Sequence, residues 1–180
     1  MGNMIRFILL MFLIGSTAFA HEHHDNELKP DKVQSDSSNL QLGSKWTNQK
    51  GNVVSLSDLN GKPQLLVMLF TRCETACPLI VEDLKEVAKD LDSGSNSHKF
   101  EVSIFSLDSF RETPDSLSAF AIKRKLPADW QLYTSNSNAV AELAAALGVR
   151  YKRLKNGDFI HSNVIYFLNS KGEIIAQKEG

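Results

Sequence analysis

Apolar residues occur along the chain first as continuous runs and then as stripes with helical spacing. The run LLVMLF within residues 64–71 suits a strand covered on both faces, and residues 100–107 have the same character. Between these runs, apolar residues recur at the i, i+3, i+4, i+7 spacing of a helix with one buried stripe: Leu84, Val87, Ala88 and Leu91. The pattern predicts a strand, a helix that begins at Pro78, and a second strand.

The pattern continues beyond the second strand. Thr113 and Pro114 supply an N-cap and a first-turn proline for a helix that runs to about Lys125. Residues 130–133 suit a short extended piece. A further amphipathic helix is indicated by Val140, Leu143, Ala144 and Leu147, and Gly148 ends it. The last two strands, 164–168 and 173–176, flank a hairpin turn of composition Asn-Ser-Lys-Gly.

This order of elements predicts an α/β fold with a mixed central sheet and helices on its faces. A thioredoxin-like fold has the same order. Such folds normally close with a helix after the hairpin, but the sequence stops at Gly180 without one. We therefore expect a thioredoxin-like domain in which the C-terminal helix has been cut away or another part of the chain covers that face.

The first twenty residues have the features of a secretory signal peptide. Arg6 is their only charge, residues 7–14 are apolar, and Ala18-Phe19-Ala20 is an A-x-A cleavage site. We therefore expect an exported, periplasmic protein that begins at His21. An uncleaved segment would be a membrane anchor, although its apolar run is well short of the roughly 20 residues that cross a bilayer.

The rest of the chain divides at about residue 42. Residues 21–42 are polar, contain histidine and offer little apolar surface to bury, so we expect a flexible tether. Residues 43–180 are the right length for one domain. The chain has 20 basic and 21 acidic residues, and the basic ones are scattered. We therefore expect no binding to nucleic acid.

The only two cysteines, Cys73 and Cys77, lie where the first strand gives way to a helix. Two are too few for a disulfide-built scaffold, whereas the start of a helix favours thiolates. At helical i, i+4 spacing the Cβ atoms lie about 5–6 Å apart, but a disulfide needs about 3.8 Å. A metal about 2.3 Å from each sulfur bridges the wider gap. Two thiolates select Cu(I), and an imidazole extends the range to Cu(II) or zinc.

The candidate imidazole belongs to His161. It follows the turn at residues 155–158 and precedes the strand VIYFL. In a thioredoxin-like topology this segment neighbours the loop that carries the cysteines. A lone histidine at the start of a strand can equally be structural, so the residue type alone leaves both roles open.

Three segments together resemble the Sco/SenC family of copper chaperones over residues 42–176. The family's C-x-x-x-C-P motif resembles the segment FTRCETACPLIVEDL. Its S-x-D-x-x-R-D-T-P segment resembles FSLDSFRETPDSLSAF, and its D-H-S ending resembles IHSNVIYFLNSKGEII. The resemblance implies that Cys73, Cys77 and His161 bind copper, as Cu(I), Cu(II) or both. It also implies delivery to the dinuclear copper centre of cytochrome c oxidase or to another cuproprotein, with another copper carrier as a further partner.

The same resemblance carries expectations for neighbouring residues. Asp108 matches a position that we interpret as structural, and Arg111 one that orients the loop of the site. Glu74 and Ile160 stand where the family commonly has proline and aspartate. Without that aspartate, we expect a backbone carbonyl or water to orient the second nitrogen of His161.

Other functions compete with copper delivery. A thiol-disulfide oxidoreductase would use Cys73 and Cys77 without any histidine, although its usual spacing is C-x-x-C. A Cys73 peroxidase and a purely structural disulfide are further alternatives. Whether the protein is an enzyme therefore stays open, with a chaperone favoured.

A second copper site is predicted at the N-terminus that signal cleavage would create. The free amine of His21, two deprotonated amides and the His23 imidazole form a square-planar nitrogen set that suits Cu(II) or Ni(II). The alternative is a solvated polar start that happens to contain histidine.

Overall fold

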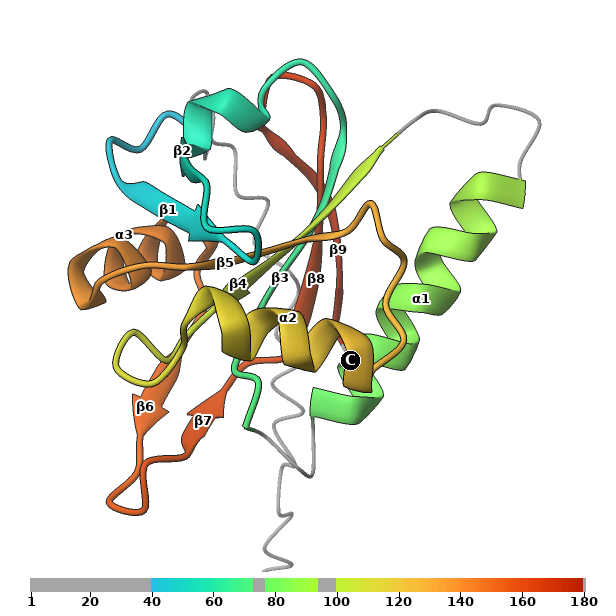
Figure 1. Cartoon of the computed structure of the whole chain (residues 1–180). Coiled ribbons are helices and arrows are strands. Elements are labelled where there is room, and N and C mark those ends of the chain that lie inside the picture. The colour runs from blue at the N-terminus through green and yellow to red at the C-terminus, as the bar shows by residue number, and fades with distance from the viewer. Residues whose placement is uncertain (1–39, 73–76, 94–99, 180) are drawn as a thin grey trace, which may run out of the picture. The chain divides into compact units, whose positions relative to one another are not determined.

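The structure is a computed structural model that describes residues 40–72, 77–93 and 100–179 (Figure 1). Within these residues, three α-helices accompany a seven-stranded sheet of order β2-β1-β5-β4-β3-β8-β9 and a separate two-stranded sheet, β6-β7. The helices are α1 (Cys77–Ser93), α2 (Pro114–Lys123) and α3 (Ser137–Leu147), and a 3-10 helix spans Leu56–Leu59. The strands are β1 (Lys45–Asn48), β2 (Val53–Ser55), β3 (Gln64–Leu69), β4 (Glu101–Ser106), β5 (Gln131–Thr134), β6 (Tyr151–Arg153), β7 (Phe159–His161), β8 (Val164–Leu168) and β9 (Ile174–Glu179).

The large sheet is mixed, as the sequence predicts. Strand β3 is an interior strand, parallel to β4 and antiparallel to β8, and all six of its residues are buried. Strands β4 and β5 are parallel, and β8 and β9 form the predicted terminal hairpin. Among the described residues, no helix follows β9.

Alternate residues of β3 enter two hydrophobic clusters on opposite faces of the sheet. Leu65 and Val67 pack with the apolar residues of α1 and α2, whereas Leu66 and Met68 pack with those of α3. This separation follows from the two-residue period of a strand. Leu91, predicted at the end of the buried stripe of α1, is 39% exposed in the last turn of that helix.

Four short strands, β1, β2, β6 and β7, are absent from the prediction. Three of them have three residues each, and β1 has four, of which Trp46 and Asn48 are buried. Strands this short carry too few residues to establish a two-residue alternation. Strand β1 pairs with the distant strand β5, whereas β2 pairs with β1 and β6 with β7, each within a local hairpin.

The described chain begins with Leu40, which is fully buried, and Leu42 packs against the same cluster. These residues lie just before the predicted domain start at residue 43. The predicted signal peptide, the remainder of the predicted tether and the predicted site at His21 and His23 all lie outside the described residues. No helix within the described parts combines the length and apolar character needed to cross a membrane.

Candidate metal centre

The three predicted copper ligands differ in what the structure says of them. Cys73 lies outside the described residues, and Cys77 is the first residue of α1, without a described side chain. His161 is fully described and is the last residue of β7. Among side chains with a described position, no three of His, Cys, Asp or Glu gather closely enough to hold a metal ion. The geometry of the candidate centre is therefore that of His161 and the segments beside it.

His161 lies on a two-stranded hairpin, which we call the β6–β7 hairpin. Tyr151 pairs with His161 at its open end, and the predicted turn at residues 155–158 forms its tip. Gly157 has a left-handed φ of 88° there, a conformation that glycine adopts without a Cβ clash. The composition of residues 155–158 predicts this turn, whereas the short strands on either side of it carry no such signal.

The aromatic residue Phe70 connects the hairpin to the end of β3. It is 2% exposed, and its ring meets the His161 imidazole edge to face with centroids 5.9 Å apart. Phe159, also on β7, packs against the same ring at 5.2 Å. Figure 1 shows the hairpin at the edge of the domain where the chain leaves β3. His161 therefore lies beside the segment that continues toward Cys73.

A backbone carbonyl orients the His161 ring, as expected where the family commonly supplies aspartate. Nδ1 of His161 lies 3.1 Å from the carbonyl oxygen of Ser162. Since a carbonyl only accepts, Nδ1 carries the hydrogen in this bond, and Nε2 carries the lone pair that can coordinate a metal. Burial lowers the pKa of His161 below its ordinary 6.5, although the bond to Ser162 opposes this shift. The imidazole is therefore in the neutral form that metal binding requires at pH 7.

The lowered pKa of His161 predicts a pH dependence of stability in the metal-free protein. The unfolded chain takes up a proton at the ordinary pKa, before the folded chain does, as the pH falls. The contribution of His161 therefore lowers the free energy of unfolding progressively as the pH falls from about 6.5 to the pKa of the folded state. Below that pKa, His161 causes no further change in the free energy of unfolding. Urea unfolding between about pH 7.5 and 5.5 with a chelator, compared between wild type and His161→Gln, measures this contribution. An identical slope in the two proteins would contradict the assignment.

Asp108 and Arg111 lie on the loop between β4 and α2. The Asp108 carboxylate is fully buried and accepts hydrogen bonds from the backbone N–H groups of Phe110 and Arg111, both at 3.3 Å. It also forms an ion pair with Nε of Arg111. Nη2 of Arg111 donates to the carbonyl oxygen of Gly157. Arg111 thus contacts the turn of the β6–β7 hairpin, consistent with its expected orienting role.

Glu112 was not identified from the sequence. Its side chain is 7% exposed, and its carboxylate accepts hydrogen bonds from Thr71 and Ser116. Thr71 precedes Cys73 by two residues. In the sequence, Glu112 is recognisable only as an acidic residue just before the N-cap Thr113. Its partner Thr71 lies 41 positions earlier in the chain, and no local pattern indicates this contact.

Comparison with known proteins agrees with this architecture. The sequence pattern of the SCO1/SenC family matches residues 33–179. The SCO1 protein homolog of Bacillus subtilis is 29% identical over 141 residues, which cover 75% of this chain and 71% of that protein. BsSco, described as a Sco-family cytochrome c oxidase assembly protein with a disulfide switch, is 25% identical with a TM-score of 0.65; the match covers 76% of this chain and 80% of BsSco.

A copper-bound relative shares the fold. Bradyrhizobium japonicum ScoI, whose structure contains copper, is 23% identical with a TM-score of 0.64, and the match covers 74% of this chain and 85% of that one. These structural similarities confirm the predicted thioredoxin-like fold. With a family match over most of its length and the arrangement of elements described above, the chain belongs to the SCO1/SenC family.

Proposed function

We propose that this protein is an exported copper chaperone that binds one copper ion through Cys73, Cys77 and His161. Its recipient is a respiratory cuproprotein, with the dinuclear copper centre of cytochrome c oxidase as the expected target. The observation that carries the proposal is the contact between His161 and Phe70, because it brings the candidate imidazole to the end of β3.

Chain connectivity relates this contact to the cysteines. Cys73 follows Phe70 by three residues, and three residues span at most about 10 Å. Cys77 begins α1, so both sulfur-bearing residues lie between the end of β3 and the first turn of α1 in the sequence. The N-terminal end of a helix favours a thiolate, which is the form that binds metal.

The donor set fits copper as a cargo. Two thiolates suit Cu(I), and a neutral imidazole with its Nε2 lone pair adds a ligand that Cu(II) favours. The orientation of His161 by Ser162 supplies the outer hydrogen bond that metal-binding histidines commonly have. The copper-bound structure of ScoI and the assembly role given to BsSco, which are statements about those relatives, support the same function here.

A copper titration of the reduced protein tests the proposal. We expect one tightly bound Cu(I) per chain in competition with a Cu(I) chelator, in excess of the amount retained by a Cys73→Ala/Cys77→Ala variant. Both proteins carry the histidines near the predicted mature N-terminus, so the difference between their copper contents excludes copper bound by those histidines. Equal binding by the two proteins would contradict the proposed site.

Thiol-disulfide exchange is the second candidate, favoured by the disulfide switch described for BsSco. It requires only the two sulfurs and access to them. The role of His161 separates the two functions, because copper binding uses its imidazole whereas dithiol exchange does not.

A further inference from the structure

We propose that the loop between β4 and α2 holds the two parts of the copper site at a fixed separation, with Arg111 and Glu112 as its positioning residues. The inference rests on the proposed copper site. One part, which we call the cysteine arm, is residues 70–72 leading to Cys73. The other, the histidine arm, is the β6–β7 hairpin with His161. The two positioning residues are neighbours in the chain, yet each contacts a different arm.

Glu112 holds the cysteine arm. Its Oε1 accepts the backbone N–H of Thr71 at 2.9 Å and the Thr71 hydroxyl at 2.7 Å. Oε2 accepts the Ser116 hydroxyl at 2.8 Å, which ties the same carboxylate to the first turn of α2. A buried carboxylate is costly without hydrogen bonds, and bonds to an ionised acceptor are among the stronger ones. The backbone of Thr71 is therefore held two residues before the first candidate ligand.

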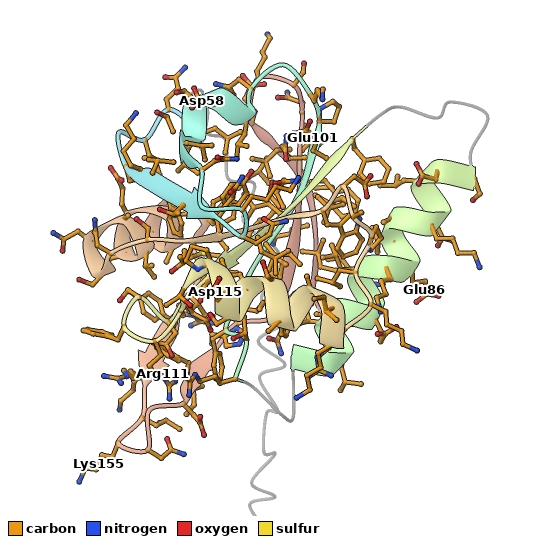
Figure 2. The ribbon with its side chains drawn as sticks, in the orientation of Figure 1. Asp58, Glu86, Glu101, Arg111, Asp115 and Lys155 are labelled. Carbon is orange, nitrogen blue, oxygen red and sulfur yellow. The ribbon has the colours of Figure 1, made fainter. Side chains whose placement is uncertain are left out.

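Arg111 holds the histidine arm. Its guanidinium bridges the buried Asp108 carboxylate and the carbonyl oxygen of Gly157, at the hairpin turn. The approach is close, since a Cβ added at Gly157 would lie 2.8 Å from Nη1 of Arg111. Figure 2 shows Arg111 between the start of α2 and the hairpin, whose tip is marked by Lys155. The guanidinium of Arg153 adds a second contact, 4.9 Å above the Phe110 ring.

The loop between the arms is itself anchored. Asp108 is fully buried, and its backbone N–H donates a hydrogen bond to Oγ of Ser106 at 3.1 Å. Thr113 caps α2 by accepting the N–H of Ser116 at 3.2 Å. Arg111 and Glu112 thus lie between Asp108 and Thr113, whose positions these hydrogen bonds stabilise, and their side chains contact the two arms. Such an arrangement fixes the separation of Thr71 and the β6–β7 hairpin before metal arrives, as preorganised sites require.

Arg111→Gln tests the histidine arm. We expect Cu(II) affinity to fall about tenfold, the lower end of the range for residues that orient a metal ligand. Cu(I) affinity should change less than about threefold, because two thiolates suit Cu(I) without the imidazole. In the metal-free protein, the nuclear Overhauser effect between the His161 and Phe70 rings should weaken. Lys155→Gln is the matched control, because it removes a charge from the same hairpin without removing the bond to Gly157.

A double-mutant cycle shows whether Arg111 acts through His161. In a His161→Ala background, Arg111→Gln should have no further effect on Cu(II) affinity. An undiminished tenfold loss in that background would overturn the positioning role. Gly157→Ala perturbs the same contact from the hairpin side, because its Cβ would lie 2.8 Å from Nη1 of Arg111 and a non-glycine residue is strained at this φ. It should also weaken Cu(II) binding in a His161-dependent way. If Arg111→Gln does not fold, Arg111→Lys, which keeps the charge without the forked guanidinium, takes its place in the cycle.

Glu112→Gln tests the cysteine arm. Its loss of charge weakens the bonds to Thr71, so the Thr71 amide proton should move upfield in the metal-free protein. Affinity for both Cu(I) and Cu(II) should fall about tenfold, because both ions use the sulfurs. Asp115→Asn is the control, because Asp115 is an exposed acid in the first turn of α2, just after Glu112 in the chain. Equal copper affinity in wild type and Glu112→Gln would overturn this arm of the proposal.

These outcomes are separable from a failure of the copper site itself. If the cysteine variants bind copper as wild type does, the proposed function is wrong. If the cysteine variants lose copper but the Arg111, Gly157 and Glu112 variants bind as wild type does, the copper site stands and the positioning role is wrong.

Discussion

Replacement of Cys73 or Cys77 by alanine is expected to reduce Cu(I) affinity by more than about 100-fold, the upper end of the effect of residues that only orient a ligand. Each substitution removes one of the two soft donors that select Cu(I), and a single thiolate with one imidazole is a poorer Cu(I) site. Competition against a Cu(I) chelator under reducing conditions measures the affinity.

The control for the cysteine variants is Leu79→Ala in the first turn of α1. Leu79 is 70% exposed, so its truncation changes the same turn without removing a donor. Circular dichroism should show folded protein for all variants. A Cys73→Ala/Cys77→Ala protein that binds Cu(I) at its folded domain as tightly as wild type would contradict the site assignment.

The second large effect is expected from His161→Ala. Loss of the imidazole should weaken Cu(II) binding by more than about 100-fold while Cu(I) binding falls much less, because the thiolate pair remains. Cu(II) titration followed by absorption and electron paramagnetic resonance measures the first quantity, and Cu(I) competition the second. His98→Ala, a histidine outside the predicted ligand set, is the matched control.

The same variant separates copper delivery from thiol-disulfide exchange in cells. A chaperone that uses three ligands should lose function with His161→Ala as well as with either cysteine variant. A thiol-disulfide oxidoreductase needs only the sulfurs. Full cytochrome c oxidase activity in cells carrying His161→Ala, with loss of activity in both cysteine variants, would favour thiol reduction over copper delivery.

The parts of the fold with many local signals could be predicted from the sequence. Strand β3 is a continuous apolar run, and α3 has both an amphipathic stripe and Gly148 in the left-handed conformation at its C-cap. Strand β1 could not be found this way, because it has four residues and only two of them are buried. Its position follows from pairing with β5, a contact between segments more than 80 residues apart.

The candidate site shows the same division. The spacing of Cys73 and Cys77 is a local feature, and the resemblance of three segments to the Sco/SenC family added His161, so the sequence predicted three candidate ligands. The contact of His161 with Phe70 and that of Glu112 with Thr71 depend on how distant segments pack. Glu112 could not be distinguished from a solvated glutamate, because burial is a property of the folded chain rather than of the residue.

The separation of β6 and β7 from the large sheet has a consequence for the rate at which cargo leaves. A two-stranded sheet is only marginally stable alone, so its opening requires the loss of the Phe159 packing and of the Arg111 bond to Gly157, while the strands of the large sheet stay paired. Such a local opening would withdraw His161 from a Cu(II) ion bound at the proposed site while β3 stays paired with β4 and β8. The dissociation rate would then follow the free energy of this opening rather than that of global unfolding. A partner that engages the opened hairpin would accelerate transfer without having to unfold the donor.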